Sequence, residues 1–391
     1  MDSLSSQAYP KSSMKTLTKE EEAEISQQIF GNSDIGDFSA YFNVYNEFAS
    51  KSTVLKLATP SGPKHGSEPL TYKTTLQVVE LLNKNPSAKR KDVLQEMRRI
   101  INPGQHTAEE EVQQALRVAV RATTMTDCDA KRHHGTDYAI ADYTPVSWAS
   151  GETYIEFFKR SIPGFRSTEH VPPRDDVVIT GDRKDSLTAW NLKRELRIKF
   201  RKTDDLARHL LFDSDRNVLF LFHHAQFLKA QIGKQLDNTD DPLSQTIEES
   251  LKSGSLPPRL LFETLYSLQD ILFPPHDNRS ARILEKLVSK RRNNFDRGCI
   301  EYDGCLSDDQ LPDNFGYVHW GQRLVRLHQH LRSRPPRNKL ERWLHRKSNE
   351  GNALFVALVA LCISICVGII SIGLAGVQIW IGWMAWKHPV A

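Results

Sequence analysis

LFVALVALCISICVGIISIGL, residues 354–374, is the stretch around which this chain is organised. Thirteen of these residues are Leu, Ile, Val or Phe, and no charged side chain occurs between Gly351 and Trp386. As a helix the stretch would extend about 31 Å, which matches the hydrocarbon thickness of a bilayer. It therefore predicts a single transmembrane helix over residues 352–380, followed by a short non-cytosolic tail at 381–391.

A basic juxtamembrane segment, residues 321–350, precedes this helix. Between Arg323 and Lys347 the chain has nine Lys or Arg residues and one acidic residue, a net charge of +8, whereas the whole chain carries +4. Positive charge beside a span is retained in the cytosol, so the large N-terminal region is predicted to be cytosolic. Anionic lipid headgroups would attract the same side chains. The basic residues that lie continuous with the span are Arg337, Lys339, Arg342, Arg346 and Lys347.

The span itself carries two further patterns. Small side chains form a stripe at Ala360, Ser364 and Gly368. Such a stripe lets membrane helices pack closely, so self-association or a membrane partner is one interpretation, and the ordinary abundance of small residues in spans is the other. Tryptophan side chains favour the membrane–water interface. Three of them lie at the far end of the stretch: Trp380, Trp383 and Trp386.

The expected membrane follows from the same features. Because the span lies close to the end of the chain, we expect insertion after synthesis, as in tail-anchored proteins. The uncharged stretch is long for an outer mitochondrial anchor and has no basic cluster after it, which favours the endoplasmic reticulum or a later secretory membrane. The first residues lack the apolar run of a signal peptide. Five cysteines, two of them inside the span, do not form a disulfide framework, so a reducing compartment is expected.

Ahead of the span, apolar spacing is mostly helical. A capping box at Thr18–Glu21 predicts a helix to Phe30, and aromatic spacing favours a helix over 39–49. Apolar residues three and four apart predict a trihelical bundle at 74–122. Two apolar runs that flank a polar turn predict a β-hairpin at 210–222, while 187–200 fits either a helix or a helix followed by a strand. Further helices are expected at 152–158, 258–272 and 280–292.

These patterns predict a mainly α fold: a helical cytosolic region with one small β-hairpin, plus one C-terminal transmembrane helix. Proline and glycine density separates the soluble part into segments. The predicted segments are a disordered lead at 1–17, a helical N-terminal region at 18–125, a loop-rich connection at 126–186 and an α-rich domain at 187–320.

Motifs that mark common chemistry are missing. The sequence has no GxxxxGK[ST], no strand-linked GxGxxG, no HExxH and no GxSxG, so neither a catalytic residue nor a cofactor is assigned. Histidines occur as the pairs His133–His134, His223–His224 and His328/His330. Neighbouring residues of a regular element point to different faces, so we expect one histidine of a pair to be buried and the other solvated, and no metal site is predicted.

Several separate segments occur in order along the second half of the chain. They are KFRKTDDLARHL (199–210), FHHAQFLK (222–229), ILFP (271–274), LVSKR (287–291), FGY (315–317) with Arg323-Leu, and WLHR (343–346). Together they resemble a large family of uncharacterised filamentous-fungal proteins with a C-terminal membrane helix. The resemblance covers roughly residues 70–390 and is densest after Leu187. It implies a fungal source and a role accessory to a fungal gene cluster, with no activity or site residues to carry over. Where members often have a Met-rich start to the span, this chain has Asn352-Ala-Leu-Phe.

Three functions from different classes are compatible with these features. A membrane-tethered interaction or scaffold protein is favoured, because the anchor is clear and enzyme motifs are missing. An enzyme of unfamiliar type acting at a membrane surface is the second. The third is a membrane-held nucleic-acid-binding regulator that uses the 74–122 bundle, which is disfavoured because no set of base-reading side chains stands on its third helix. The lipid bilayer is the one partner that the sequence itself implies.

Overall fold

The computed structural model describes residues 17–32, 36–57, 72–101, 109–134, 138–165, 177–179, 181–236, 242–289, 295–302, 315–333 and 352–387. The chain divides into two compact units, Met1–Leu331 and Arg332–Ala391. Residues 1–16 of the predicted disordered lead and the basic residues from Arg337 to Lys347 lie outside the described residues.

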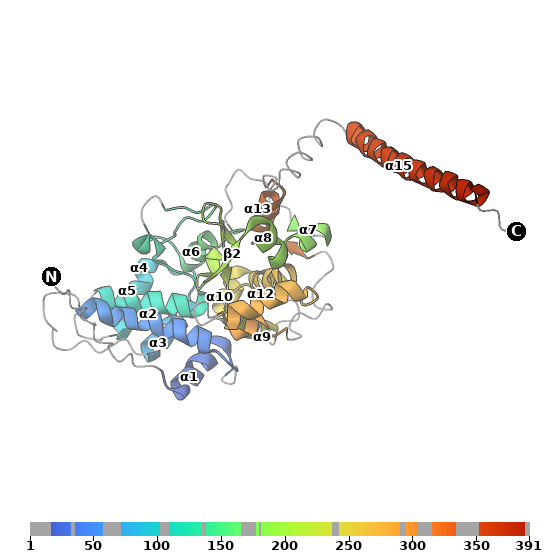
Figure 1. Cartoon of the computed structure of the whole chain (residues 1–391). Coiled ribbons are helices and arrows are strands. Elements are labelled where there is room, and N and C mark those ends of the chain that lie inside the picture. Colours follow the sequence, from blue (N-terminus) through green and yellow to red (C-terminus); the bar gives the residue numbers. More distant parts are fainter. Residues whose placement is uncertain are drawn as a thin grey trace, which may run out of the picture. The chain divides into compact units, whose positions relative to one another are not determined.

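Five helices begin the first unit, α1 to α5 (Figure 1). The capping box predicted at Thr18 is present, with Glu21 donating its backbone N–H to the threonine hydroxyl. The trihelical bundle is also present: α3 contacts α4 and α5, and these two contact each other. The bounds are Lys19–Phe30 for α1, Ser39–Leu57 for α2, Tyr72–Lys84 for α3, Arg90–Ile101 for α4 and Glu109–Thr124 for α5.

The connecting region contains short elements. A second capping box, formed by Thr153 and Glu156, begins α6, a helix that was predicted at 152–158. A glycine with φ of +90°, Gly164, lies in the turn after α6. The elements are η1 (Ala130–His133), α6 (Tyr154–Ser161), β1 (Val177–Val178), α7 (Gly181–Ser186) and α8 (Ala189–Leu196).

A three-stranded sheet of order β2-β4-β3 follows. The predicted hairpin is confirmed by the antiparallel pairing of β3 (Leu211–Asp213) with β4 (Val218–Phe222). Residues 187–200 form a helix and then a strand, because α8 leads into β2 (Lys199–Thr203). β2 pairs with β4 in parallel, with Thr203 opposite Phe222, a pairing that the sequence did not predict. All five residues of β4 are buried, as expected for a central strand.

The remainder of the first unit is helical apart from β5 (Gly316–Tyr317), which pairs antiparallel with β1. The helix predicted at 258–272 is α11 continued by one π-helical segment, η4. The bounds are α9 (Ala225–Leu236), η2 (Leu206–Arg208), η3 (Pro242–Ser244), α10 (Ile247–Lys252), α11 (Pro258–Tyr266), η4 (Ser267–Leu272), α12 (Asn278–Ser289), η5 (Arg297–Cys299) and α13 (Gly321–Arg332).

One continuous hydrophobic core runs from α1 to α13. Phe30 of α1 packs edge-on against Phe227 of α9 at 5.7 Å between ring centroids, and Tyr41 of α2 stacks on the same ring at 5.8 Å. Such aromatic pairs add about 0.5–1.5 kcal/mol beyond their buried area. The core therefore crosses both predicted segment boundaries, near residues 126 and 187.

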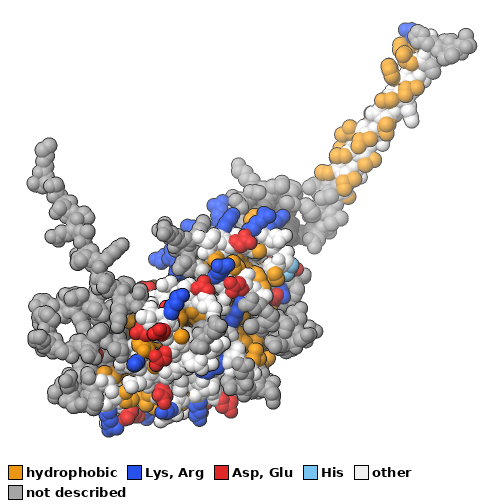
Figure 2. Space-filling model, turned by 90° about the horizontal axis from the view of Figure 1, so that it is seen from below, with side chains coloured by type: hydrophobic (Ala, Val, Ile, Leu, Met, Phe, Trp, Pro, Cys, Tyr) orange, Lys and Arg blue, Asp and Glu red, His pale blue; other side chains and the backbone are white. Residues whose placement is uncertain are grey.

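The second unit contains α15, Asn352–Lys387. Apolar side chains cover the visible length of this helix (Figure 2). Its residues Ala360–Met384 form a helix long and apolar enough to cross a membrane, and none of that stretch is buried against other parts of the chain. The mainly α class, the small hairpin and the apolar C-terminal helix are thus as predicted. The helix begins where expected but continues past residue 380 to Lys387.

Candidate functional site

A cleft is lined in part by the parallel strands β2 and β4, through Arg201, Lys202 and Thr203 of β2 and Phe220 of β4. The register of the two strands places Thr203 opposite Phe222, so the residues that follow each strand meet at one edge of the sheet. These residues are Asp204 from β2 and the pair His223–His224 from β4. The carboxyl ends of parallel strands are a common position for ligand sites, because loops diverge there and leave a crevice.

Asp204 accepts two hydrogen bonds through the same oxygen. Nε2 of His223 and Nε2 of His224 each lie 2.9 Å from its Oδ1. Both histidine side chains are only 1% exposed, whereas that of Asp204 is 30% exposed. The prediction that one histidine of the pair is solvated is wrong. The pair follows the last residue of β4 and precedes α9, so the alternation that separates neighbours in a strand does not apply.

The backbone sets the proton positions in this cluster. The N–H of Asp296 donates to Nδ1 of His223 at 3.0 Å, so the proton of neutral His223 sits on Nε2 and is donated to Asp204. Burial lowers the pKa of His223 to about 4 and also lowers the pKa of His224. Burial of Asp204 raises the pKa of its carboxyl, but hydrogen bonds from both histidines outweigh this and hold that pKa well below its usual range. The cluster is an ionised carboxylate held by two neutral imidazoles.

These three side chains are also close enough to share a metal ion. A metal-bound histidine normally donates its second N–H to an acceptor. Nδ1 of His223 does the opposite and accepts an N–H, so metal binding through Nε2 would leave the buried N–H of Asp296 without its partner. Only Asp204 and His224 would then remain as ligands. The donor set fits a hydrogen-bonded cluster better than a metal centre.

The cleft has a volume of about 490 Å³ and sixteen lining residues. Five of them are basic and three are acidic. Four aromatic side chains complete much of the remaining wall, and the ring of Tyr138 stacks on that of His134 at 4.3 Å. The basic residues are Arg121, Arg201, Lys202, Arg208 and Arg216; the acidic ones are Asp127, Asp204 and Asp205; the aromatic ones are Phe48, Tyr138, Tyr143 and Phe220.

The segment Thr203–Asp205 also caps a short helix. Asp205 caps the short helix η2 by accepting the N–H of Ala207 at 3.0 Å. It also accepts a hydrogen bond from the hydroxyl of Tyr143 at 3.2 Å. Burial raises the pKa of Asp205. Asp204, one residue earlier, accepts hydrogen bonds from the histidines instead, so the pKa values of the two neighbouring carboxyls are shifted in opposite directions.

The residues predicted from the sequence as membrane contacts do not contribute to the cleft. Ala360, Ser364 and Gly368 lie on α15, and a Cβ at Gly368 would meet no atom within 4 Å. The side chains of Trp380 and Trp383 are exposed on the same helix, and Trp386 falls within its bounds. Nζ of Lys387 lies 4.9 Å from the Trp383 ring centroid. The free cysteines Cys362 and Cys366 are exposed on this helix too.

Sequence reasoning missed the cleft residues because no motif marks them. The one available signal was the apolar run of β4 followed directly by two histidines, together with two aspartates directly after a second candidate strand. The chain matches no protein-family model, no curated protein and no solved structure.

Proposed function

We propose that this protein is a membrane-tethered interaction or scaffold protein, in which α15 is the anchor and the helical unit is the recognition module. The observation that carries the proposal is the apolar stretch Ala360–Met384, 25 residues with no part buried against the chain. An isolated apolar helix of this length is costly in water and stable in a bilayer. The resemblance to fungal membrane proteins, with its implied accessory role in a gene cluster, fits this proposal.

The proposed topology places the helical unit in the cytosol. Nine basic residues between Arg323 and Lys347 precede the span, whereas Lys387 and His388 are the basic residues close behind it. The positive-inside rule then orients the span. Anionic lipids are proposed contacts of the basic segment, and the length of the apolar stretch favours the endoplasmic reticulum or a later secretory membrane.

Recognition is favoured over catalysis by the arrangement at the cleft. Both histidines beside it are buried, and Nε2 of each is committed to Asp204. A molecule in the cleft would meet the carboxylate of Asp204 and the ring of His134, which stacks on Tyr138, and not the two buried imidazoles. An enzyme acting at a membrane surface is the second candidate, supported by the ionised Asp204 carboxylate in the cleft wall.

Carbonate extraction tests the anchor. A chain that ends at Glu350 should be released into the soluble fraction, and a reporter fused to residues 337–391 should stay with carbonate-washed membranes. A full-length chain in which Ile365 and Ile369 are changed to Asp is the matched control, since two charges in the span disfavour insertion without shortening the chain. Retention of the truncated chain in the washed pellet would contradict the proposed anchor.

Glycosylation tests the topology. The sequon Asn278-Arg-Ser280 should remain unmodified, and an added sequon on a spacer after Ala391 should be modified. Ser280 is buried and hydrogen-bonded to Asp277, so its own accessibility is poor in the folded chain. A second sequon placed in the exposed loop at Gly151 removes that ambiguity. Modification at Gly151 together with an unmodified C-terminal sequon would reverse the orientation.

A further inference from the structure

Two arginines in the cleft have no acidic group of the described residues within ion-pair or hydrogen-bond distance. The guanidinium groups of Arg121, on α5, and Arg208, on η2, form no ion pair or hydrogen bond within the described part of the chain, and Nε of each is buried without a hydrogen-bond partner. A buried donor left unpaired costs about 1–3 kcal/mol or more when it belongs to a charged group. Such donors are retained where a ligand satisfies them.

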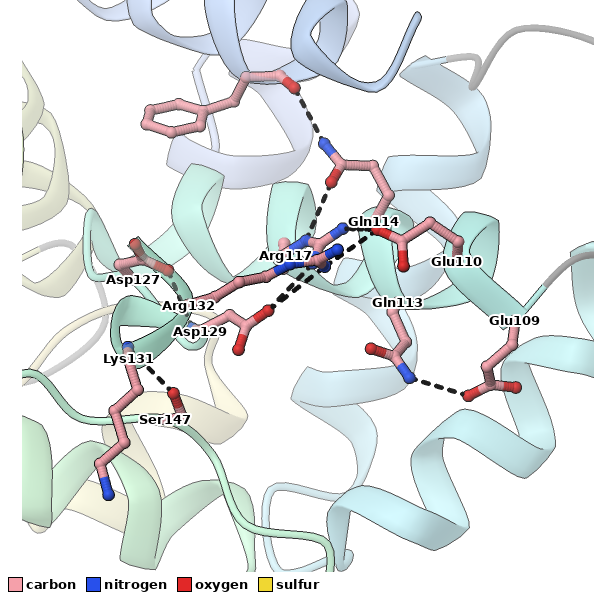
Figure 3. A network of polar contacts seen from close by, with 11 residues as sticks. Glu109, Glu110, Gln113, Gln114, Arg117, Asp127, Asp129, Lys131, Arg132 and Ser147 are labelled. Carbon is pink, nitrogen blue, oxygen red and sulfur yellow. Dashed lines mark hydrogen bonds and ion pairs between the residues drawn. The ribbon is translucent and has the colours of Figure 1, made fainter. Parts of the chain in front are cut away.

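Two other arginines of the same unit, Arg117 and Arg323, have several hydrogen-bond acceptors each. Arg117, one helical turn before Arg121, donates to Gln114 at 2.9 Å, to Asp129 at 3.0 Å and to Glu110 at 2.8 Å (Figure 3). Arg323 donates to Asp142 at 3.3 Å and to the carbonyls of Ala207 and His209. Nε of Arg90, outside the cleft, is also buried without a hydrogen-bond partner, so what distinguishes Arg121 and Arg208 is that both line the same cleft.

Aromatic rings hold both guanidinium groups in place. Arg121 lies over the Phe48 ring at 4.5 Å, and Arg208 lies over the Phe220 ring at 4.6 Å and the Tyr143 ring at 5.6 Å. Stacking uses the face of a guanidinium and leaves its N–H edge available for two parallel hydrogen bonds. That edge matches the oxygens of a phosphate or carboxylate.

The acidic groups of the cleft do not neutralise this site. Asp204 is engaged by two histidines, and Oδ1 of Asp127 accepts the N–H of Asp129 at 2.9 Å. Asp205 is held by Ala207 and Tyr143, and burial disfavours its ionised form more than the nearby charges of Arg121 and Arg208 favour it. With Arg201, Lys202 and Arg216 on the same wall, the cleft retains an excess of positive charge.

We propose that the cleft binds a phosphate-bearing small molecule or lipid headgroup, with Arg121 and Arg208 as its principal hydrogen-bond donors. The volume of about 490 Å³ suits a ligand of that size, since pockets for small molecules span about 300–1,000 Å³. Phosphate is favoured over a single carboxylate because two guanidinium groups and three further cations can share its charge and its oxygens. The proposal does not depend on the membrane anchor.

Two experiments test the two sources of the phosphate group. For a free ligand, the full chain in neutral detergent micelles is titrated calorimetrically with inorganic pyrophosphate. Hydrogen exchange tests whether the ligand is a lipid headgroup. The full chain is placed in phosphatidylcholine nanodiscs with and without phosphatidic acid, and the protection of peptides from the cleft is compared. Arg121→Gln and Arg208→Gln should each weaken the binding by about tenfold or more, because each loses a charge-assisted pair. Arg194→Gln, an exposed arginine outside the cleft, is the matched control and should bind normally.

The outcomes separate the two sources. Saturable pyrophosphate binding that both cleft variants lose supports a free phosphate ligand, and protection that requires phosphatidic acid and both arginines supports a headgroup. If a cleft variant fails to fold, Arg201→Gln and Arg216→Gln, which alter exposed side chains, should still weaken binding and reduce its salt dependence. No saturable binding in either arm, or equal binding by the wild-type chain and all cleft variants, overturns the proposal.

Discussion

The carboxylate of Glu263, on α11, accepts the backbone N–H of Trp320 at 3.0 Å, directly before α13 begins. The same carboxylate accepts the N–H groups of Val318 at 2.8 Å and His319 at 2.7 Å, so one fully buried side chain satisfies three successive backbone donors. Trp320 also donates its indole N–H to Thr264 at 2.8 Å. This arrangement ties the segment after β5 to the core.

Glu263 predicts a pH-dependent stability. Burial raises the pKa of Glu263 to about 7, although three N–H donors and Arg259 favour the ionised form. The folded chain therefore binds this proton more tightly than the unfolded chain, and the stability it supplies is lost as pH rises from 4.5 to about 7. Relative to Glu263→Gln, the wild-type free energy of unfolding should fall by up to about 3 kcal/mol across that range. Urea unfolding at several pH values measures this difference in unfolding free energy, with the exposed Glu80→Gln as control. A difference between wild type and Glu263→Gln that does not change with pH would contradict the prediction.

The lowered pKa of His223 predicts the opposite pH dependence, with stability falling as the pH falls. Its pKa is lowered to about 4, so its contribution to stability is complete above 6.5 and is lost as pH falls from 6.5 to about 4. Replacing His223 with Gln should remove up to about 3 kcal/mol of acid-induced destabilisation. The variant should also be less stable than wild type at neutral pH, because Asp204 and the N–H of Asp296 lose a partner. The exposed His276→Gln is the control, and identical acid sensitivity of His223→Gln and wild type would refute the assignment.

The backbone conformation and close neighbours of Gly164 predict that any side chain at this position destabilises the fold. Its φ is +90°, and a Cβ there would lie 2.7 Å from the carbonyl oxygen of Val318 and 2.8 Å from Cα of His319. Gly164→Ala should therefore lower the free energy of unfolding by about 2 kcal/mol or more, through backbone strain and a clash with backbone atoms. Gly151→Ala, which meets no atom within 4 Å, should change it little. Comparable melting temperatures for the two variants would disprove this account.

The small-residue stripe of α15 makes a prediction about association. Changing Ser364 and Gly368 to Leu should reduce any self-association without blocking insertion, because larger side chains keep helix backbones apart. Ile365→Leu with Ile369→Leu, which conserves volume on a neighbouring face, serves as the control. A two-hybrid reporter in a bacterial inner membrane measures the effect. Equal signals from the wild-type span and the stripe variant would leave the stripe without a role in packing.

Local patterns were sufficient for much of the fold. Apolar spacing located α3, α4 and the following helix α5, and the capping boxes at Thr18 and Thr246 show the side-chain geometry that such sequences favour. The hairpin of β3 and β4 followed from two apolar runs beside a polar turn. These features depend on residues within a few positions of one another, so a single sequence contains the information that determines them.

Non-local pairings could not be obtained in this way. Residues 187–200 fitted either a helix or a helix followed by a strand, and the strand β2 forms because β4 supplies its hydrogen-bond partners. The pairing of β1 with β5 joins Val177 to Tyr317, two residues that are far apart in the sequence. The candidate site was missed for the same reason, since its walls come from α2, α5, the segment around Tyr143, β2 and η2.

The sequence by itself determined that this chain has an apolar helix long enough to span a membrane, a basic segment before it and a mainly helical unit. Composition and short-range periodicity are enough for those properties, because the hydrophobic effect acts on each segment separately. Only the tertiary structure decided that Asp204 meets His223 and His224, and that Arg121 and Arg208 line one cleft with Nε of each lacking a hydrogen-bond partner. Those relationships depend on the register of β2 with β4 and on packing between distant helices, which no local pattern specifies.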